Sequence, residues 1–256
     1  MFRRGVASLA FAVLAVMALA GSALASGGTI AWKGQTWDVS ANATATVDGD
    51  DHLTVTRDTG TNDAYVHVNR LLPLVGGESF VNEHGTPWIQ VSYLDNGAFR
   101  GVDFFVDDEV TAKNPRLQAG SLFSCDGIGY ARYSAPATTE EVVFAVPNDG
   151  TACTGTRTAG TPHTIYAGER ADGTIDYNFD GTWYSSTLIK DNVGHMNFND
   201  VYLRLRGSSG TTATFTDFQY GANHPSTKAD CKKAKGSLPP AFRNQGSCVS
   251  YFASGK

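Results

Sequence analysis

Residues Asp200–Arg206 (DVYLRLR) alternate strictly between two kinds of side chain. The apolar face is Val201, Leu203 and Leu205, and the opposite face is Tyr202, Arg204 and Arg206. Successive side chains of a β-strand point to opposite faces of the sheet. A repeat of two residues therefore predicts a strand with one buried face.

The same alternation occurs in Thr174–Asp180 (TIDYNFD) and recurs between residues 29 and 220, where no stretch of helical length has a 3.6-residue period. Short turn signals, mostly Asp-Gly pairs that favour hairpins, separate the alternating runs. They are Asp48-Gly49, Asp95-Asn96-Gly97, Asp149-Gly150, Asp172-Gly173, Asp180-Gly181 and Ser208-Ser209-Gly210. About ten or more strands joined in this way predict an all-β fold, either a two-sheet antiparallel sandwich or a barrel.

Two pairs of segments carry a resemblance to a known fold. Trp32–Val39 with Val47–Val55 resembles the first strands of concanavalin A-like jelly rolls of the laminin G and glucanase type. Asp200–Leu205 with Ala213–Phe218 is similar to the closing hairpin of that fold. The resemblance covers residues 29–220 and implies a two-sheet antiparallel jelly-roll sandwich. It implies no activity, because one fold carries many functions.

The N-terminus has the three parts of a secretory signal peptide. Arg3 and Arg4 precede an apolar run from Val6 to Ala20, and Ala23-Leu24-Ala25 supplies a cleavage site of small residues. The run of about 15 apolar residues is shorter than the roughly 20 that span a membrane. We therefore expect residues 1–25 to be removed, no membrane span in the mature chain, and a secreted, extracellular protein.

The charge of the mature chain disfavours one class of partner. Loss of Arg3 and Arg4 changes the formal charge from −5 to −7. Nucleic-acid binders normally present a basic patch, so an acidic chain argues against a nucleic-acid partner.

Four cysteines follow the signal peptide, and none belongs to a Cys-x-x-Cys pair. In an oxidising compartment this pattern favours two disulfides over a zinc site. Three pairings are possible. The short segments that would be closed favour Cys125 with Cys153 and Cys231 with Cys248.

The C-terminal residues differ from the strand region. Gly221–Lys228 lacks apolar periodicity and is typical of a linker, so we predict a jelly-roll domain over 26–222 and a linker with a disulfide-closed tail over 223–256. Asp230-Cys231-Lys232 followed by Phe242–Tyr251 resembles a tail of uncharacterised bacterial exported proteins. That tail commonly has a Gly-Trp step after its first cysteine, where this chain has Gly236-Ser237-Leu238.

The sequence offers no linear motif for catalysis. Jelly-roll glucanases place two carboxylates on one strand in a Glu-x-Asp-x-(x)-Glu run, and this chain has none. It also lacks a Gly-x-Ser-x-Gly elbow, zinc-type histidine spacing and a glycine-rich phosphate loop. We therefore expect no catalytic residues and no cofactor. Calcium remains an alternative at Asp48-Gly49-Asp50-Asp51, although Asp-Gly is also a common hairpin turn that needs no metal.

Aromatic residues on the polar faces of two strands are the best candidates for a binding site. In Trp88–Tyr93, Trp88 and Gln90 lie opposite the apolar face, and in Ala64–Asn69, Tyr65 and His67 share a face. Aromatic rings stack on sugars while neighbouring polar groups hydrogen-bond their hydroxyls. The alternative is that Trp88 is covered and simply packs.

Three functional hypotheses follow. The first is a secreted, non-catalytic protein that binds an extracellular polysaccharide or a cell-surface glycan. The second is a carbohydrate-active enzyme with carboxylates from separate strands. The third is a structural cell-envelope protein without a small ligand.

Overall fold

The computed structural model describes residues 23–59, 63–69, 86–94, 96, 101–107, 116–121, 129–135, 138–144, 159–196, 198, 200–234 and 238–254. The predicted Cys125–Cys153 disulfide and most of the predicted signal peptide lie outside these residues.

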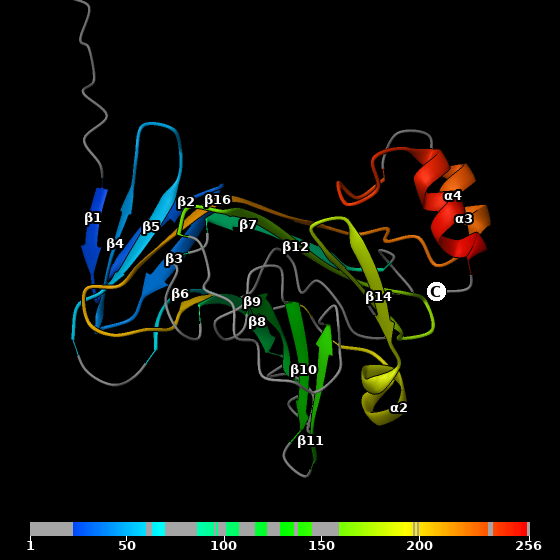
Figure 1. Ribbon diagram of the computed structural model, residues 1–256, viewed down its shortest axis with the longest axis horizontal. Coiled ribbons are helices and arrows are strands. Elements are labelled where there is room, and N and C mark those ends of the chain that lie inside the picture. Colours follow the sequence, from blue (N-terminus) through cyan, green and yellow to red (C-terminus); the bar gives the residue numbers. More distant parts are fainter. Residues whose placement is uncertain are drawn as a thin grey trace, which may run out of the picture.

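Two antiparallel sheets form a jelly-roll sandwich (Figure 1). We name sheet A the one that contains the last strand of the chain. Its strands, in spatial order, are β1 (Ala23–Ser26), β4 (Ala43–Val47), β5 (Leu53–Arg57), β16 (Thr212–Gly221), β7 (Trp88–Leu94), β12 (Pro162–Glu169), β13 (Ile175–Phe179) and β14 (Thr182–Ser186).

Sheet B contains the strand with which the sequence analysis began. In spatial order it consists of β11 (Thr138–Phe144), β10 (Gly129–Ala135), β9 (Arg116–Ser121), β8 (Val102–Asp107), β15 (Asp200–Leu205), β6 (Ala64–Asn69), β3 (Gln35–Val39) and β2 (Thr29–Trp32). The predicted fold class is confirmed.

Inward-facing residues of both sheets form one core. Val201, Leu203 and Leu205 of β15 are fully buried, and Ile89 and Val91 of β7 are at most 1% exposed. The alternation in the sequence therefore identified the inner face of these strands correctly.

Two of the tightest hairpins have positive φ at both turn residues, which is the signature of a type I′ turn. Asp180 and Gly181 connect β13 to β14 with φ of 48° and 91°. Lys33 and Gly34 connect β2 to β3 with φ of 48° and 72°. The predicted Asp180-Gly181 turn is thus confirmed.

Three short helices accompany the sheets in the described part of the chain: α2 (Leu188–Val193), α3 (Lys228–Lys233) and α4 (Gln245–Ala253). Cys231 of α3 is bonded to Cys248 of α4, as predicted. We call residues 224–254 the C-terminal element. Figure 1 shows α3 and α4 close to the end of sheet A that carries β14. No described helix combines the length and the apolar character needed to cross a membrane.

Strand β13 differs from its prediction. The sequence suggested a half-buried strand, with Ile175, Tyr177 and Phe179 inward. In the structure its polar face is buried as well, with Asp176 at 0% and Asn178 at 6% exposure. Tyr251 and His224 of the C-terminal element contact Asp176 from the outer side of the sheet. The tail therefore packs on the sandwich, which its lack of periodicity did not indicate.

Candidate functional site

The four predicted binding residues lie on two different sheets. Trp88 and Gln90 project from the outer face of sheet A, because the intervening Ile89 points into the core. Tyr65 and His67 project from the outer face of sheet B, because Val66 points into the core. The structure does not bring the two pairs together, since the sandwich core separates them.

An aromatic cluster occupies the outer face of sheet B. Tyr202 of β15 lies between Tyr65 and His67 of β6, and all three rings are partly exposed. The rings of His67 and Tyr202 are stacked, with centroids 3.9 Å apart and planes 6° apart. Tyr65 meets Tyr202 edge to face at 5.4 Å. We call these three residues the sheet B aromatic cluster.

Two buried polar atoms beside this cluster lack hydrogen bonds. His67 Nε2 and Asp200 Oδ1 face each other as an ion pair at 3.6 Å, which is too long for a hydrogen bond, and neither atom has a hydrogen-bond partner among the described residues. The side chain of Asp200 is only 2% exposed. Buried polar groups are normally satisfied, so an unsatisfied pair marks a place where a ligand hydroxyl or a water molecule can bind.

A buried ion pair supports the neighbouring part of this face. The Arg204 guanidinium donates two hydrogen bonds to Asp103, from Nε to Oδ1 and from Nη2 to Oδ2, both at 2.7 Å. Asp63 accepts from Arg204 and Arg206 at 3.2 and 3.4 Å. Bidentate geometry fixes the planes of both groups, so this part of the face is rigid.

Trp88 is partly exposed and also makes several packing contacts. Its indole N–H donates to the carbonyl oxygen of Ala222 at 3.0 Å, and its ring stacks on Tyr166 at 5.9 Å. A Cβ atom at Gly221 would lie 3.0 Å from the indole, so the ring also covers the backbone of β16. Gln90 pairs in register with Gln219 and Tyr166 and is 9% exposed.

Asp176 is the centre of a buried hydrogen-bond network on sheet A. Arg170 binds it in bidentate fashion at 2.6 and 2.8 Å. His224 Nε2 lies 2.8 Å from the same carboxylate, and the Tyr251 and Ser185 hydroxyls each donate to it at 2.7 Å. Two of these partners, His224 and Tyr251, belong to the C-terminal element, so the network holds that element on the sheet.

The pKa values in this network follow from burial and from the Asp176 charge. Burial opposes ionisation of Asp176, but hydrogen bonds from His224 and Arg170 outweigh it and lower the pKa of the carboxyl. Burial, followed by the nearby Asp176 charge, raises the pKa of the Tyr166 phenol well above its ordinary value. Tyr166 therefore keeps its proton and can donate to His224 Nδ1, which lies 2.6 Å away.

The Asp176–His224–Tyr166 chain resembles a proton relay in composition. However, His224 is 2% exposed, and both of its nitrogens are already engaged. Gly168 leaves the space for it, since a Cβ there would lie 2.6 Å from His224 Nδ1. The arrangement therefore anchors the segment at residue 224 and does not present a base to solvent.

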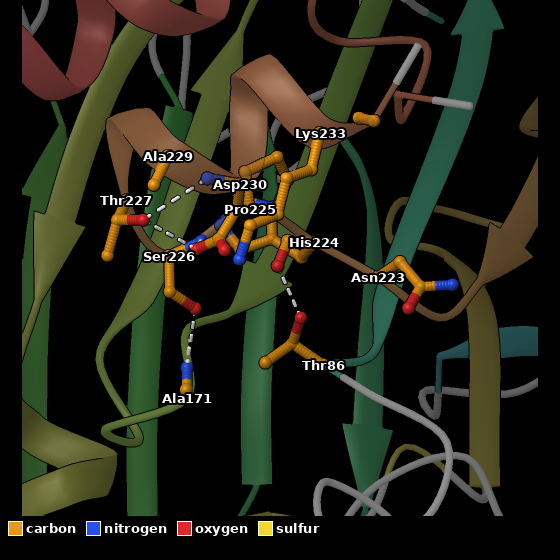
Figure 2. Close-up of a pocket in the computed structure, with 11 residues that line it drawn as sticks. Thr86, Ala171, Asn223, His224, Pro225, Ser226, Thr227, Ala229, Asp230 and Lys233 are labelled. Atoms are coloured by element: carbon orange, nitrogen blue, oxygen red, sulfur yellow. Dashed lines mark hydrogen bonds between the residues drawn. The ribbon is translucent and has the colours of Figure 1, made fainter. Parts of the chain in front are cut away.

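A pocket of about 730 Å³ lies where this segment enters α3. Figure 2 shows it between the strand that begins after Thr86 and the first turn of α3. Its lining includes Thr227, Asp230 and Lys233, and the Ser226 hydroxyl accepts a hydrogen bond from the Ala171 N–H. Asp230 faces inward, where its carboxylate accepts from the Thr227 hydroxyl at 2.8 Å.

In the candidate calcium turn, the carboxylates of Asp48 and Asp51 bind other groups of the protein. Asp48 Oδ1 accepts from the backbone N–H groups of Asp50 and His52, and the hydrogen bond from His52 is the main cause of the lowered pKa of the Asp48 carboxyl. Asp51 pairs with Lys33 at 2.6 Å. Within the described ranges no three His, Cys, Asp or Glu side chains are grouped so as to hold a metal ion.

Sequence reasoning missed Asp200, Asp176 and His224 as parts of these sites. The alternation in β15 did place Tyr202 on the outer face. Nothing in the sequence alone indicated that β15 pairs with β6, which is what brings Tyr202 beside His67.

No protein-family model matches the chain, and no curated protein does. Among solved structures, the chain is similar to a binding domain of botulinum neurotoxin DC in complex with SialylT, at 9% identity and a TM-score of 0.49, covering 88% of this chain and 50% of that one. It is also similar to an alginate lyase from Pseudomonas aeruginosa, at 10% identity and a TM-score of 0.40, covering 70% and 85%. A third similar structure is a homodimeric agglutinin from chicken liver, at 9% identity and a TM-score of 0.37, covering 61% and 99%. The chain thus spans half the length of the toxin domain, and its function has to be inferred from its own residues.

Proposed function

We propose that the chain is a secreted, non-catalytic glycan-binding protein whose ligand is an extracellular polysaccharide. The site is the outer face of sheet B, formed by Tyr65, His67 and Tyr202 with Asp200 beneath them. The observation that carries the proposal is the unsatisfied pair His67 Nε2 and Asp200 Oδ1 beside three partly exposed rings.

Sugar recognition needs both parts of this arrangement. A pyranose ring has apolar C–H faces that stack on aromatic side chains, and hydroxyls that need hydrogen-bond partners. The sheet B aromatic cluster supplies the stacking surface, and His67 Nε2 and Asp200 Oδ1, which pair at 3.6 Å without a hydrogen bond, retain the capacity to bond a sugar hydroxyl. Trp88 and Gln90 are left out of the site, because they lie on the opposite outer face.

Replacing Tyr65 by Ala tests the proposal. Loss of one stacking ring is worth about 0.5–1.5 kcal/mol beyond its buried area, so binding should weaken at least several-fold. The measurement is a glycan array, followed by polysaccharide pull-down and a melting curve for the same variant. Gln219→Ala is the matched control, since Gln219 is exposed on the outer face of sheet A. Unchanged binding by a stably folded Tyr65→Ala protein would contradict the assignment of this face.

A second candidate is a carbohydrate-active enzyme, because two carboxylates from separate strands meet on the same face. Asp107 of β8 and Asp200 of β15 are direct cross-strand partners, and they are 5% and 1% exposed. Glycoside hydrolysis uses two carboxylates placed on either side of the scissile bond, and this pair is the candidate for that arrangement. Release of reducing ends from a polysaccharide that is abolished in Asp200→Asn would favour the enzyme. Binding without release of reducing ends favours the non-catalytic glycan-binding protein.

Secretion is part of the same proposal. The disulfide in the C-terminal element is compatible with an oxidising compartment. Cleavage after residue 25 predicts a mature chain that begins at Ser26, which mass spectrometry of the exported protein can check. Such a chain keeps one residue of β1, whose other three residues pair with β4 in the structure.

A further inference from the structure

Charge is distributed very unevenly along the chain. Residues 223–256 contain six Lys and Arg residues and one Asp, whereas residues 26–222 contain twelve Lys and Arg residues against twenty-four Asp and Glu residues. The formal charge is therefore positive in the tail and strongly negative in the sandwich. This contrast is hidden in the net charge of the whole chain.

Four cations of the C-terminal element that the structure describes face solvent. Lys228, Lys232, Lys233 and Arg243 are all exposed. None of them forms an ion pair with any residue that the structure describes. Asp230, the one acidic residue in the sequence of the C-terminal element, accepts hydrogen bonds from the Thr227 hydroxyl and the Ser226 N–H.

The scaffold holds these cations in fixed positions. Lys228 and Lys232 are four residues apart on α3, so they lie on one helix face about 6 Å apart along the axis. The Gln245 amide of α4 donates to the carbonyl oxygens of Cys231 and Lys232 at 3.1 and 3.0 Å. That contact brings the start of α4, preceded by Arg243, beside the end of α3.

The pocket at residue 224 extends this cationic surface inward. Lys233, at the C-terminal end of α3, is among the residues that line it (Figure 2). Its volume of about 730 Å³ is large enough for a sugar residue.

We propose that the C-terminal element binds a polyanionic polysaccharide through Lys228, Lys232, Lys233 and Arg243. This assigns a second binding site, separate from the sheet B aromatic cluster. The second site binds through positive charge, whereas the sheet B site binds through aromatic stacking. Lys228 and Lys232 contact the charged groups of successive sugar units. Lys233 binds an acidic group that enters the pocket.

The surroundings favour an acidic glycan over other polyanions. A DNA duplex carries a charge about every 1.7 Å and requires a broad basic face, but this cationic area borders an acidic sandwich. A lipid surface requires an exposed apolar face, and the outer residues of α4 include Gln245, Ser247 and Ser250. A single flexible polysaccharide strand can follow the narrow cationic area alone.

The test uses the mature protein and immobilised polygalacturonate, with uncharged pullulan as the reference polymer. We expect retention on polygalacturonate that falls as NaCl rises, because each cation that binds the polymer releases counterions. The double variant Lys228→Gln with Lys232→Gln should bind about tenfold more weakly and with a smaller salt dependence. Melting curves verify that it stays folded.

Lys190→Gln is the matched control, because Lys190 is also an exposed lysine on a short helix but pairs with Asp172 at 2.7 Å. It should bind polygalacturonate like the unchanged protein. Equal retention on pullulan, or full retention by the double variant, would overturn the proposal. Tighter binding to duplex DNA or to phosphatidylglycerol vesicles would overturn the choice of polysaccharide.

Discussion

At the scale of single residues, Asp176 has the clearest energetic role. Its carboxylate joins β13 and the loop at Arg170 to two residues of the C-terminal element. The sequence showed Asp176 only as one polar position in an alternating strand. Its burial depends on residues about 50 and 75 positions further along the chain, which local patterns cannot reveal.

Asp176→Ala should destabilise the fold severely. Removing one partner of a buried ion pair leaves the Arg170 guanidinium uncompensated, which costs about 3–5 kcal/mol. Urea denaturation monitored by tryptophan fluorescence measures the loss. Asp172→Ala is the control, since Asp172 is 53% exposed in its pair with Lys190 and should cost no more than about 1 kcal/mol. Equal losses in both variants would show that the network is not the anchor described above.

The same carboxylate predicts how stability depends on pH. The pKa of Asp176 is lowered on folding below its ordinary value of 3.8, so the folded state is favoured while the group is ionised. This contribution is complete above about pH 4 and is lost as pH falls through the folded pKa. The free energy of unfolding should therefore fall less between pH 5 and pH 3 in Asp176→Asn than in the unchanged protein. Parallel pH profiles would contradict this assignment.

At the scale of elements, alternation and turn chemistry allowed much to be predicted. The inner faces of β7, β13 and β15, the Asp180-Gly181 hairpin and the Cys231–Cys248 bond all agree with the sequence. The pairing of strands that are distant in the sequence could not be predicted, because their register depends on packing throughout the core. That limit explains why Trp88 and Tyr65 could be assigned correctly to outer faces and still lie on different sheets.

Gly168→Ala should loosen the contact between β12 and the C-terminal element. The added methyl group would lie 2.6 Å from both His224 Nδ1 and the Tyr166 hydroxyl, so the segment at residue 224 must shift. We expect a loss of about 1–3 kcal/mol, as for other overpacked sites, and faster proteolysis within residues 224–254. Gly49→Ala serves as the control, since a Cβ there meets nothing within 4 Å. Equal protease sensitivity in both proteins would show that the contact tolerates the methyl group.

At the scale of the whole molecule, the second disulfide remains a prediction. We expect peptide mapping without reductant to recover Cys125 linked to Cys153. A closed loop of this size stabilises by roughly 3–4 kcal/mol in the chain-entropy estimate. A link from Cys125 or Cys153 to the C-terminal element would contradict both the pairing and the Cys231–Cys248 bond in the structure.

The position of β16 in sheet A has a consequence for biosynthesis. Strand β16, formed by residues 212–221, is what joins β5 to β7, so without it sheet A consists of two unconnected pieces. A chain emerging from the ribosome N-terminus first therefore cannot complete sheet A until residues 212–221 have been synthesised. Cooperative folding is delayed, because the contacts of β16 that offset the entropy cost of ordering the earlier strands of sheet A form last. Under the secretion proposed above, this strand order keeps sheet A incomplete until late in synthesis, which suits transport of an unfolded chain.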